Sequence, residues 1–130
     1  MTSEEFVRVV KLQTSDSAVS GTIKSLTRPA GRKPSKKLLW LSDWYNQLSD
    51  KDRAMLRAAL GEAAEMAVFE FFCILDGVSS IEDGPNKGEL ELHFVKSAET
   101  TRLNDPRHEE LHNLFNALCG EAANDIQGPC

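Results

Sequence analysis

The pentapeptide HEELH, residues 108–112, has the residue types and the spacing of a zinc site. Two imidazoles one helical turn apart can share a zinc ion, and a glutamate beside the first histidine can activate a metal-bound water. In this chain the histidines are His108 and His112, and the base would be Glu109. A zinc-dependent hydrolase is therefore the first function that the sequence raises.

The surroundings of HEELH argue against this chemistry. The motif resembles that of zinc peptidases over five residues only, and it departs from their stricter pattern at Glu110, which is charged, and from one extended form at Phe115, which replaces a glycine. A zinc site also needs a third protein ligand. The sequence offers His93, Glu121 and Asp125, on the polar face of a predicted hairpin and near a chain end. We therefore expect no metal, cofactor or catalytic residue, and retain zinc hydrolysis as an alternative.

A second motif is the basic segment TRPAGRKPSKK, residues 27–37, which has five Lys or Arg, two prolines and no acid. Pro-flanked arginines resemble an AT-hook, an extended arm that binds the minor groove. The Arg-Gly-Arg-Pro centre of that motif is absent. We expect residues 27–37 to be a solvated linker between helices, and retain a nucleic-acid-binding regulator that uses residues 28–37 as a second alternative.

Composition is typical of one globular domain spanning residues 1–130, with 41% hydrophobic and 27% charged residues. Charge is unevenly placed: residues 1–48 carry eight bases against four acids, a net of +4, whereas residues 49–130 carry seven against sixteen, a net of −9. An acidic body disfavours nucleic acid and suits a basic protein partner. No segment resembles a signal peptide or a membrane span, and three widely spaced cysteines suggest reduced thiols, so we expect a cytoplasmic protein.

Periodicity and capping signals predict the secondary structure. Ser49 and Gly77 delimit a long apolar helix, which should be the centre of the fold. Asp105 and Pro106 are typical of a helix start. The remaining expectations are a strand or loose arm over 1–15, short helices after 16 and over 38–48, a hairpin of 78–82 with 89–95 joined by DGPNKG, and a frayed tail over 122–130.

These elements predict an α+β fold: a helical domain around the long helix, with a small antiparallel hairpin packed on one side. The core should then contain large apolar side chains from the long helix, the hairpin and the last helix. The expected core residues are Trp40 or Trp44, Leu56, Leu60, Phe71, Phe72, Leu75, Leu92, Phe94, Leu114 and Phe115.

Three runs within residues 38–116 carry a wider resemblance: LSDWYNQLSDKDR, AVFEFFCILDGVSSIED and LNDPRHEELHNLFN. They resemble small uncharacterised bacterial proteins with a W-Y-N helix, an L-D-G-V turn and a closing L-N-D to L-H-x-L-F helix. The resemblance implies a bacterial source and a fold, but no activity. Asp76, Asn104, Asp105 and His112 match the pattern, and together with Glu82 they form the candidate binding set.

The function that these observations favour is a non-enzymatic protein-binding module of the bacterial cytosol. Small size, acidity and the lack of a complete catalytic set fit an immunity protein that neutralises a basic toxin.

Overall fold

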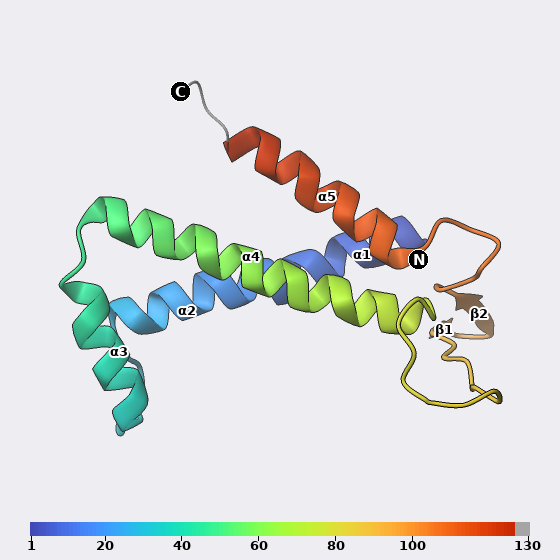
Figure 1. Ribbon diagram of the computed structural model, residues 1–130, viewed down its shortest axis with the longest axis horizontal. Coiled ribbons are helices and arrows are strands. Elements are labelled where there is room, and N and C mark those ends of the chain that lie inside the picture. Colours follow the sequence, from blue (N-terminus) through green and yellow to red (C-terminus); the bar gives the residue numbers. More distant parts are fainter. Residues whose placement is uncertain (127–130) are drawn as a thin grey trace.

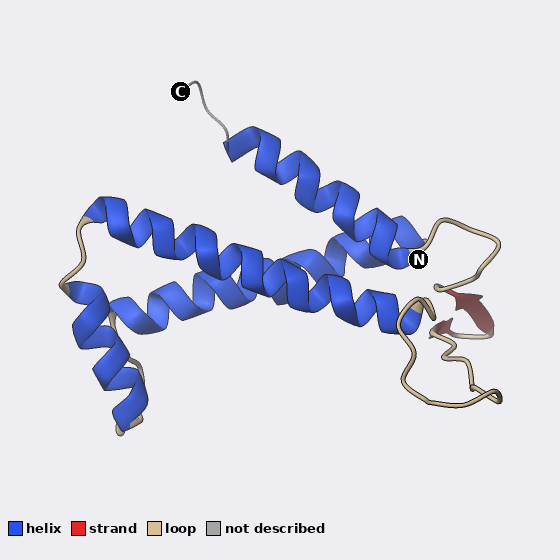
Figure 2. Ribbon diagram, in the orientation of Figure 1, coloured by secondary structure: helices blue, strands red, loops and turns tan. Residues whose placement is uncertain are grey.

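The computed structural model describes residues 1–126 and has the expected α+β class, with helices around one long helix and a two-stranded antiparallel sheet (Figure 2). The long helix α4 spans the molecule, the N-terminal helices cross it on one side, and the sheet lies at its carboxyl end (Figure 1). No helix of the described part is both long and apolar enough to cross a membrane. In chain order the elements are α1 (Ser3–Lys11), a π-helical segment (Leu12–Asp16), α2 (Ser17–Thr27), α3 (Lys36–Asn46), α4 (Asp50–Leu75), β1 (His93–Lys96), β2 (Glu99–Arg102) and α5 (Leu111–Ile126).

The N-terminal residues are helical, so the expectation of a strand or loose arm over 1–15 is wrong. Thr2 and Glu5 form a reciprocal capping box at the start of α1. Val7 is fully buried, and Phe6 and Val10 pack on the same core. Spacings of three and four place these side chains on one helical face, and their burial outweighs the β propensity of the valines.

The π-helical segment joins α1 to α2 and carries a polar cluster. Lys11 Nζ lies 2.8 Å from Asp16 Oδ1, and Ser15, which is buried, donates to the Lys11 carbonyl at 3.2 Å. Burial opposes protonation of Lys11, but the contact with Asp16 prevails and raises its pKa. On α5, burial and the nearby Glu65 carboxylate raise the pKa of the Cys119 thiol to about 12.

The linker between α2 and α3 has nearly the expected limits, because α2 ends at Thr27 and α3 begins at Lys36 after a Ser35 cap. The Ser42 hydroxyl donates to the Leu26 carbonyl at 2.6 Å, and Tyr45 is buried beneath the Arg53 guanidinium. These contacts attach α3 to α2 and to the start of α4.

Helix α4 has the expected limits, from the Ser49 cap to Leu75, but its buried face differs from the expected one. Phe72 is buried against Phe6 and Phe115, with ring centroids 6.2 and 5.5 Å away. Phe71, the preceding residue, is 58% exposed. The core therefore lies in the carboxyl half of α4, where α1 and α5 meet it.

The expected core set is accordingly correct in part. Phe72 and Phe115 are buried, and Leu75, Leu92 and Leu114 are partly buried against them. Leu56, Leu60 and Phe94 have intermediate exposure. The prediction that Trp40 or Trp44 lies in the core is wrong. They are 71% and 48% exposed, because α3 contacts α2 through other side chains.

The hairpin is real, but its strands are not those expected. β1 pairs with β2 through a tight turn that places Ser97 at a φ of 55°, and DGPNKG belongs to a long loop, residues 78–92. The loop begins at Gly77, whose φ of 77° lets Val78 and Ser79 donate back to the Cys73 carbonyl. The turn-forming residues of DGPNKG therefore lie in a wide loop and do not form the turn of the hairpin.

Helix α5 begins at Leu111, five residues later than Pro106, and continues to Ile126. Of the tail expected over 122–130, residues 122–126 are therefore helical and 127–130 lie outside the described part. Segments 100 positions apart in the chain are joined before this helix, because the Ser3 hydroxyl of α1 donates to the Leu103 carbonyl at 2.7 Å.

Candidate functional site

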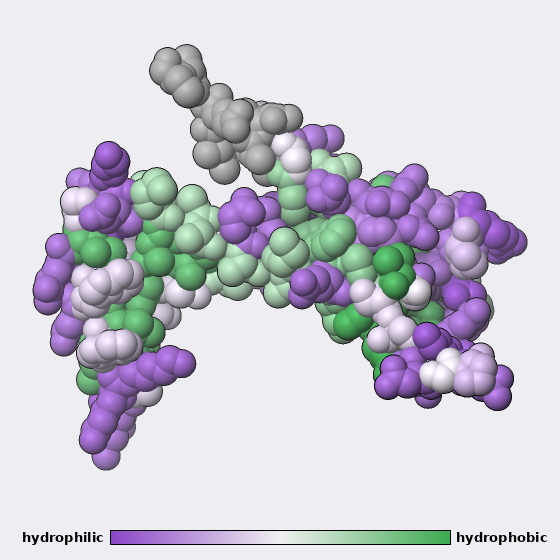
Figure 3. Space-filling model, viewed as in Figure 1, coloured by the Kyte–Doolittle hydropathy of each residue, from purple (hydrophilic) through white to green (hydrophobic). Residues whose placement is uncertain are grey.

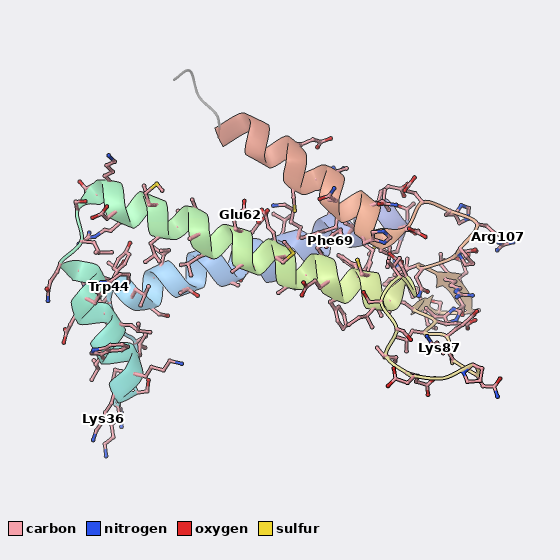
Figure 4. The ribbon with its side chains drawn as sticks, in the orientation of Figure 1. Lys36, Trp44, Glu62, Phe69, Lys87 and Arg107 are labelled. Atoms are coloured by element: carbon pink, nitrogen blue, oxygen red, sulfur yellow. The ribbon has the colours of Figure 1, made fainter. Side chains whose placement is uncertain are left out.

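The candidate binding residues converge at the carboxyl end of α4, beside the long loop on which Figure 4 labels Lys87. Asp76 follows the last turn of that helix, and its side chain is 3% exposed. One of its oxygens, Oδ2, accepts the backbone N–H of His112 at 2.8 Å and lies 2.8 Å from Nδ1 of the same residue. Asp76 therefore supplies, from another helix, the anionic cap that the first turn of α5 needs.

The His112 imidazole is held on both sides. Its Nε2 lies 3.2 Å from Glu110 Oε2, and its ring meets the Phe69 ring edge to face at 5.8 Å between centroids. Each ring nitrogen therefore contacts a carboxylate, that of Asp76 just after α4 or that of Glu110 just before α5. Both nitrogens are therefore committed to contacts between elements.

The zinc interpretation of HEELH requires both histidines on one helix, and the structure does not place them so. Because α5 starts at Leu111, His108 lies in the preceding turn and not one helical turn behind His112. His108 and Glu109 border a second hollow, with residues of α1 and β2. Among the side chains that the structure describes, those of residues 1–121, no three His, Cys, Asp or Glu are arranged to hold a metal ion.

Asn104 connects three segments and is buried. Its amide nitrogen donates to the carbonyls of Leu75 and Leu90 at 2.6 and 2.8 Å, and its oxygen accepts the Leu92 N–H at 2.8 Å. These bonds fix the end of α4, the long loop and the strand exit to one another. The amide is thus occupied by structural contacts and cannot also bind a ligand through the same atoms.

Asp105 caps a turn rather than a helix. Its carboxylate accepts from the guanidinium and the backbone N–H of Arg107, at 2.6 to 3.2 Å, and its carbonyl accepts the His108 N–H. These bonds hold the pKa of the Asp105 carboxyl well below its ordinary value. Asp105 and Pro106, which in sequence are typical of a helix start, therefore form this turn instead of beginning a helix.

Glu82 organises the long loop. Its Oε2 accepts the Gly88 N–H at 2.7 Å, and its carbonyl accepts the Ser80 hydroxyl at 2.6 Å. The side chain remains exposed to solvent, as are all residues from 77 to 91. Glu82 therefore both shapes the loop and presents negative charge on it.

Together these residues surround one open pocket of about 490 Å³. Asp76, Glu82, Asn104 and Asp105 line it, and His112 lies behind it, in contact with Asp76. Sequence reasoning missed four charged residues of the wall. They are Lys87, Glu89, Arg102 and Glu110.

The pocket wall is acidic, with five carboxylate side chains against two cations. Glu91, just outside it, contacts His93 and Arg102 at 3.0 Å each, and these two contacts lower its pKa. Glu89 was visible in sequence as one of the alternating polar residues of 89–95, but its partner strand was misplaced. Arg102 and Glu110 had no local signal, because only the tertiary fold brings them to the loop.

Comparison of the chain with protein families, curated proteins and solved structures finds no match.

Proposed function

We propose that this protein is a non-enzymatic binding module that holds a basic segment of a protein partner in the acidic pocket at the carboxyl end of α4. The specific form we propose is an immunity protein of the bacterial cytosol that neutralises a basic toxin.

The observation that carries the proposal is the charge and exposure of the pocket wall. Glu82 and Glu89 are exposed on the long loop, and Glu110, which also lines the pocket, is about half-exposed. A hollow lined by carboxylates concentrates the field of those charges and attracts cationic groups. Lys or Arg side chains of a partner would form charge-assisted hydrogen bonds there.

The buried polar side chains are engaged in hydrogen bonds within the fold, which supports binding rather than catalysis. Asp76 and His112 cap and clamp α5, and Asn104 joins three segments, so the groups that could transfer protons are engaged in the fold. The exposed carboxylates are on a loop, where binding residues often lie on a rigid scaffold.

The test uses the protein encoded next to this one in the genome as the partner. Isothermal titration should give binding that weakens as salt is raised, and co-expression should relieve any growth arrest that the neighbour causes. Absence of binding to a stably folded neighbour, at low salt, would contradict the toxin-specific form of the proposal.

A matched pair of variants locates the surface. Glu89→Lys changes the pocket charge by two units, and we expect it to lower the affinity by about tenfold or more. Asp43→Lys makes the same change on the exposed surface of α3 and should leave the affinity nearly unchanged. Equal losses in both variants would show that net charge, and not the pocket, governs binding.

A further inference from the structure

The chain exposes far more surface than a monomer of its size. Its accessible area is 9840 Å². A folded monomer of 14.4 kDa is expected to expose about 6,800 Å², so the excess is about 3,000 Å². Obligate homodimers bury about 1,000 to 2,500 Å² on each subunit, which is the scale of this excess.

Three of the large apolar side chains that are exposed lie on α4. Met55, Met66 and Phe71 are 65%, 55% and 58% exposed on this helix. The alanines at 59, 63 and 67, which are also exposed, connect them. Figure 3 shows hydrophobic residues uncovered along the middle of α4 and near its junction with α2 and α3. We call Met55, Ala59, Ala63, Met66, Ala67 and Phe71 the α4 face.

We propose that the α4 face is the interface of a twofold symmetric homodimer, in which α4 packs antiparallel against α4 of a second copy. The occupant of the face is thus this same chain.

The order of residues on the face favours self-association. Residues 55, 59, 63, 67 and 71 form a ridge with a spacing of four, and such ridges interdigitate in the commonest class of helix pairs. When the row is reversed about Ala63, Met55 meets Phe71 of the second copy and Ala59 meets Ala67. A twofold interface requires this kind of self-complementarity. The small side chains at the centre permit close approach, and the large ones fill the space on either side.

Charge supports the antiparallel orientation. Residues 28–37, with five Lys or Arg, lie at the start of α3, toward the same end of the molecule as the amino end of α4, whereas the acidic pocket lies at the carboxyl end of α4 (Figure 1). An antiparallel encounter brings opposite charges toward each other, and a parallel one brings like charges together. Because helices of this packing class cross at about 50°, their ends diverge, and the pocket stays open to a partner.

The first experiment is sedimentation velocity of the full chain across a dilution series. The wild type should sediment as a dimer that dissociates on dilution. Ala63→Glu places two carboxylates against each other at the symmetry axis and should raise the dimer dissociation constant by about 100-fold or more. Ala58→Glu makes the same change at an exposed position outside the α4 face and should leave the constant unchanged.

A second pair of variants tests the register and does not depend on position 63. Ala59→Lys with Ala67→Glu places opposite charges across the axis and should retain the dimer, whereas Ala59→Glu with Ala67→Glu places like charges there and should dissociate it. Circular dichroism verifies that each variant is folded. A wild type that is monomeric at every concentration, whether or not another protein covers the face, would overturn the proposal. Equal effects of the Ala58 and Ala63 variants, or of the two double variants, would also overturn it.

Discussion

Replacing Asp76 by alanine should destabilise the protein by about 3–5 kcal/mol, because it removes both hydrogen bonds that this buried carboxylate accepts from His112. Asp76 is 3% exposed, so solvent screens its contacts little. It accepts two hydrogen bonds from His112, and bonds to a charged group contribute about 1.5–3 kcal/mol each. The change also removes the anion at the start of α5, which contributes about 0.3–1 kcal/mol.

A double-mutant cycle separates the two roles of this carboxylate. His112→Ala removes the imidazole but keeps the backbone N–H, so Asp76 can still cap α5. The coupling between Asp76→Ala and His112→Ala should be about 1–3 kcal/mol, because only the contact between side chains is shared. Asp76→Asn keeps one acceptor oxygen and should cost less, about 1–2 kcal/mol.

Urea unfolding followed by circular dichroism measures these differences, at one fixed protein concentration because self-association would alter apparent stability. Asp83→Ala, an exposed acid of the long loop, is the control and should change stability by about 0.5 kcal/mol at most. A loss below about 1 kcal/mol for Asp76→Ala, or no coupling in the cycle, would refute the assignment of Asp76 as the cap and clamp of α5.

Three further predictions follow from the core, the thiols and the HEELH motif. Phe72→Ala should lower the free energy of unfolding by about 3–5 kcal/mol, and Phe71→Ala should lower it by less than about 1 kcal/mol, both at concentrations where the chain is monomeric. The opposite order of the two losses would show that the core does not lie around Phe72. Cys119, whose pKa is raised to about 12, should resist iodoacetamide in the native protein at pH 8 and react in urea, as mass spectrometry of the tryptic peptide would show. EDTA should leave the melting temperature of untagged protein unchanged, as should His108→Ala; stoichiometric zinc together with a lower melting temperature in EDTA would contradict this.

Sequence alone was sufficient where the deciding signals are local. Ser49 and Gly77 act within a few residues of themselves, and they gave the limits of α4 correctly. The buried side of that helix was not predictable in the same way, because apolar residues occupy nearly every face of its second half. Phe71 and Phe72 are equivalent in sequence, and only the approach of α1 and α5 distinguishes them.

The elements that were predicted wrongly are those in which tertiary contacts override strong local signals. DGPNKG has stronger turn signals than Lys96 to Glu99, yet the hairpin turns at Ser97, a residue with little preference for a positive φ. Asp105 and Pro106 have the chemistry of a helix start, but Arg107 captures the carboxylate and α5 takes its cap from Asp76. A cap supplied from 36 residues away leaves no pattern in a window of sequence.

The candidate binding set was four residues from a resemblance together with Glu82, and four of the five line one pocket. The contacts that these residues make in the pocket could not be predicted from the sequence. Asn104 and Asp105 look like ligand-binding groups in sequence, whereas in the fold their polar atoms are occupied by backbone and Arg107. The exposed charge comes from residues such as Glu89, which sequence reasoning treated as the outer face of a strand.

The bond from Ser3 to the Leu103 carbonyl, which joins groups 100 positions apart in the chain, has a consequence for biosynthesis. The first helix emerges from the ribosome early, but Leu111 and Phe115, which complete the packing around Val7, are made much later. Until then Val7 and Phe72 lack their final neighbours. Loops that close over most of the chain slow folding, so this helical protein should fold more slowly than a bundle of sequentially adjacent helices. A nascent chain stalled before residue 111 should remain accessible to proteases and chaperones.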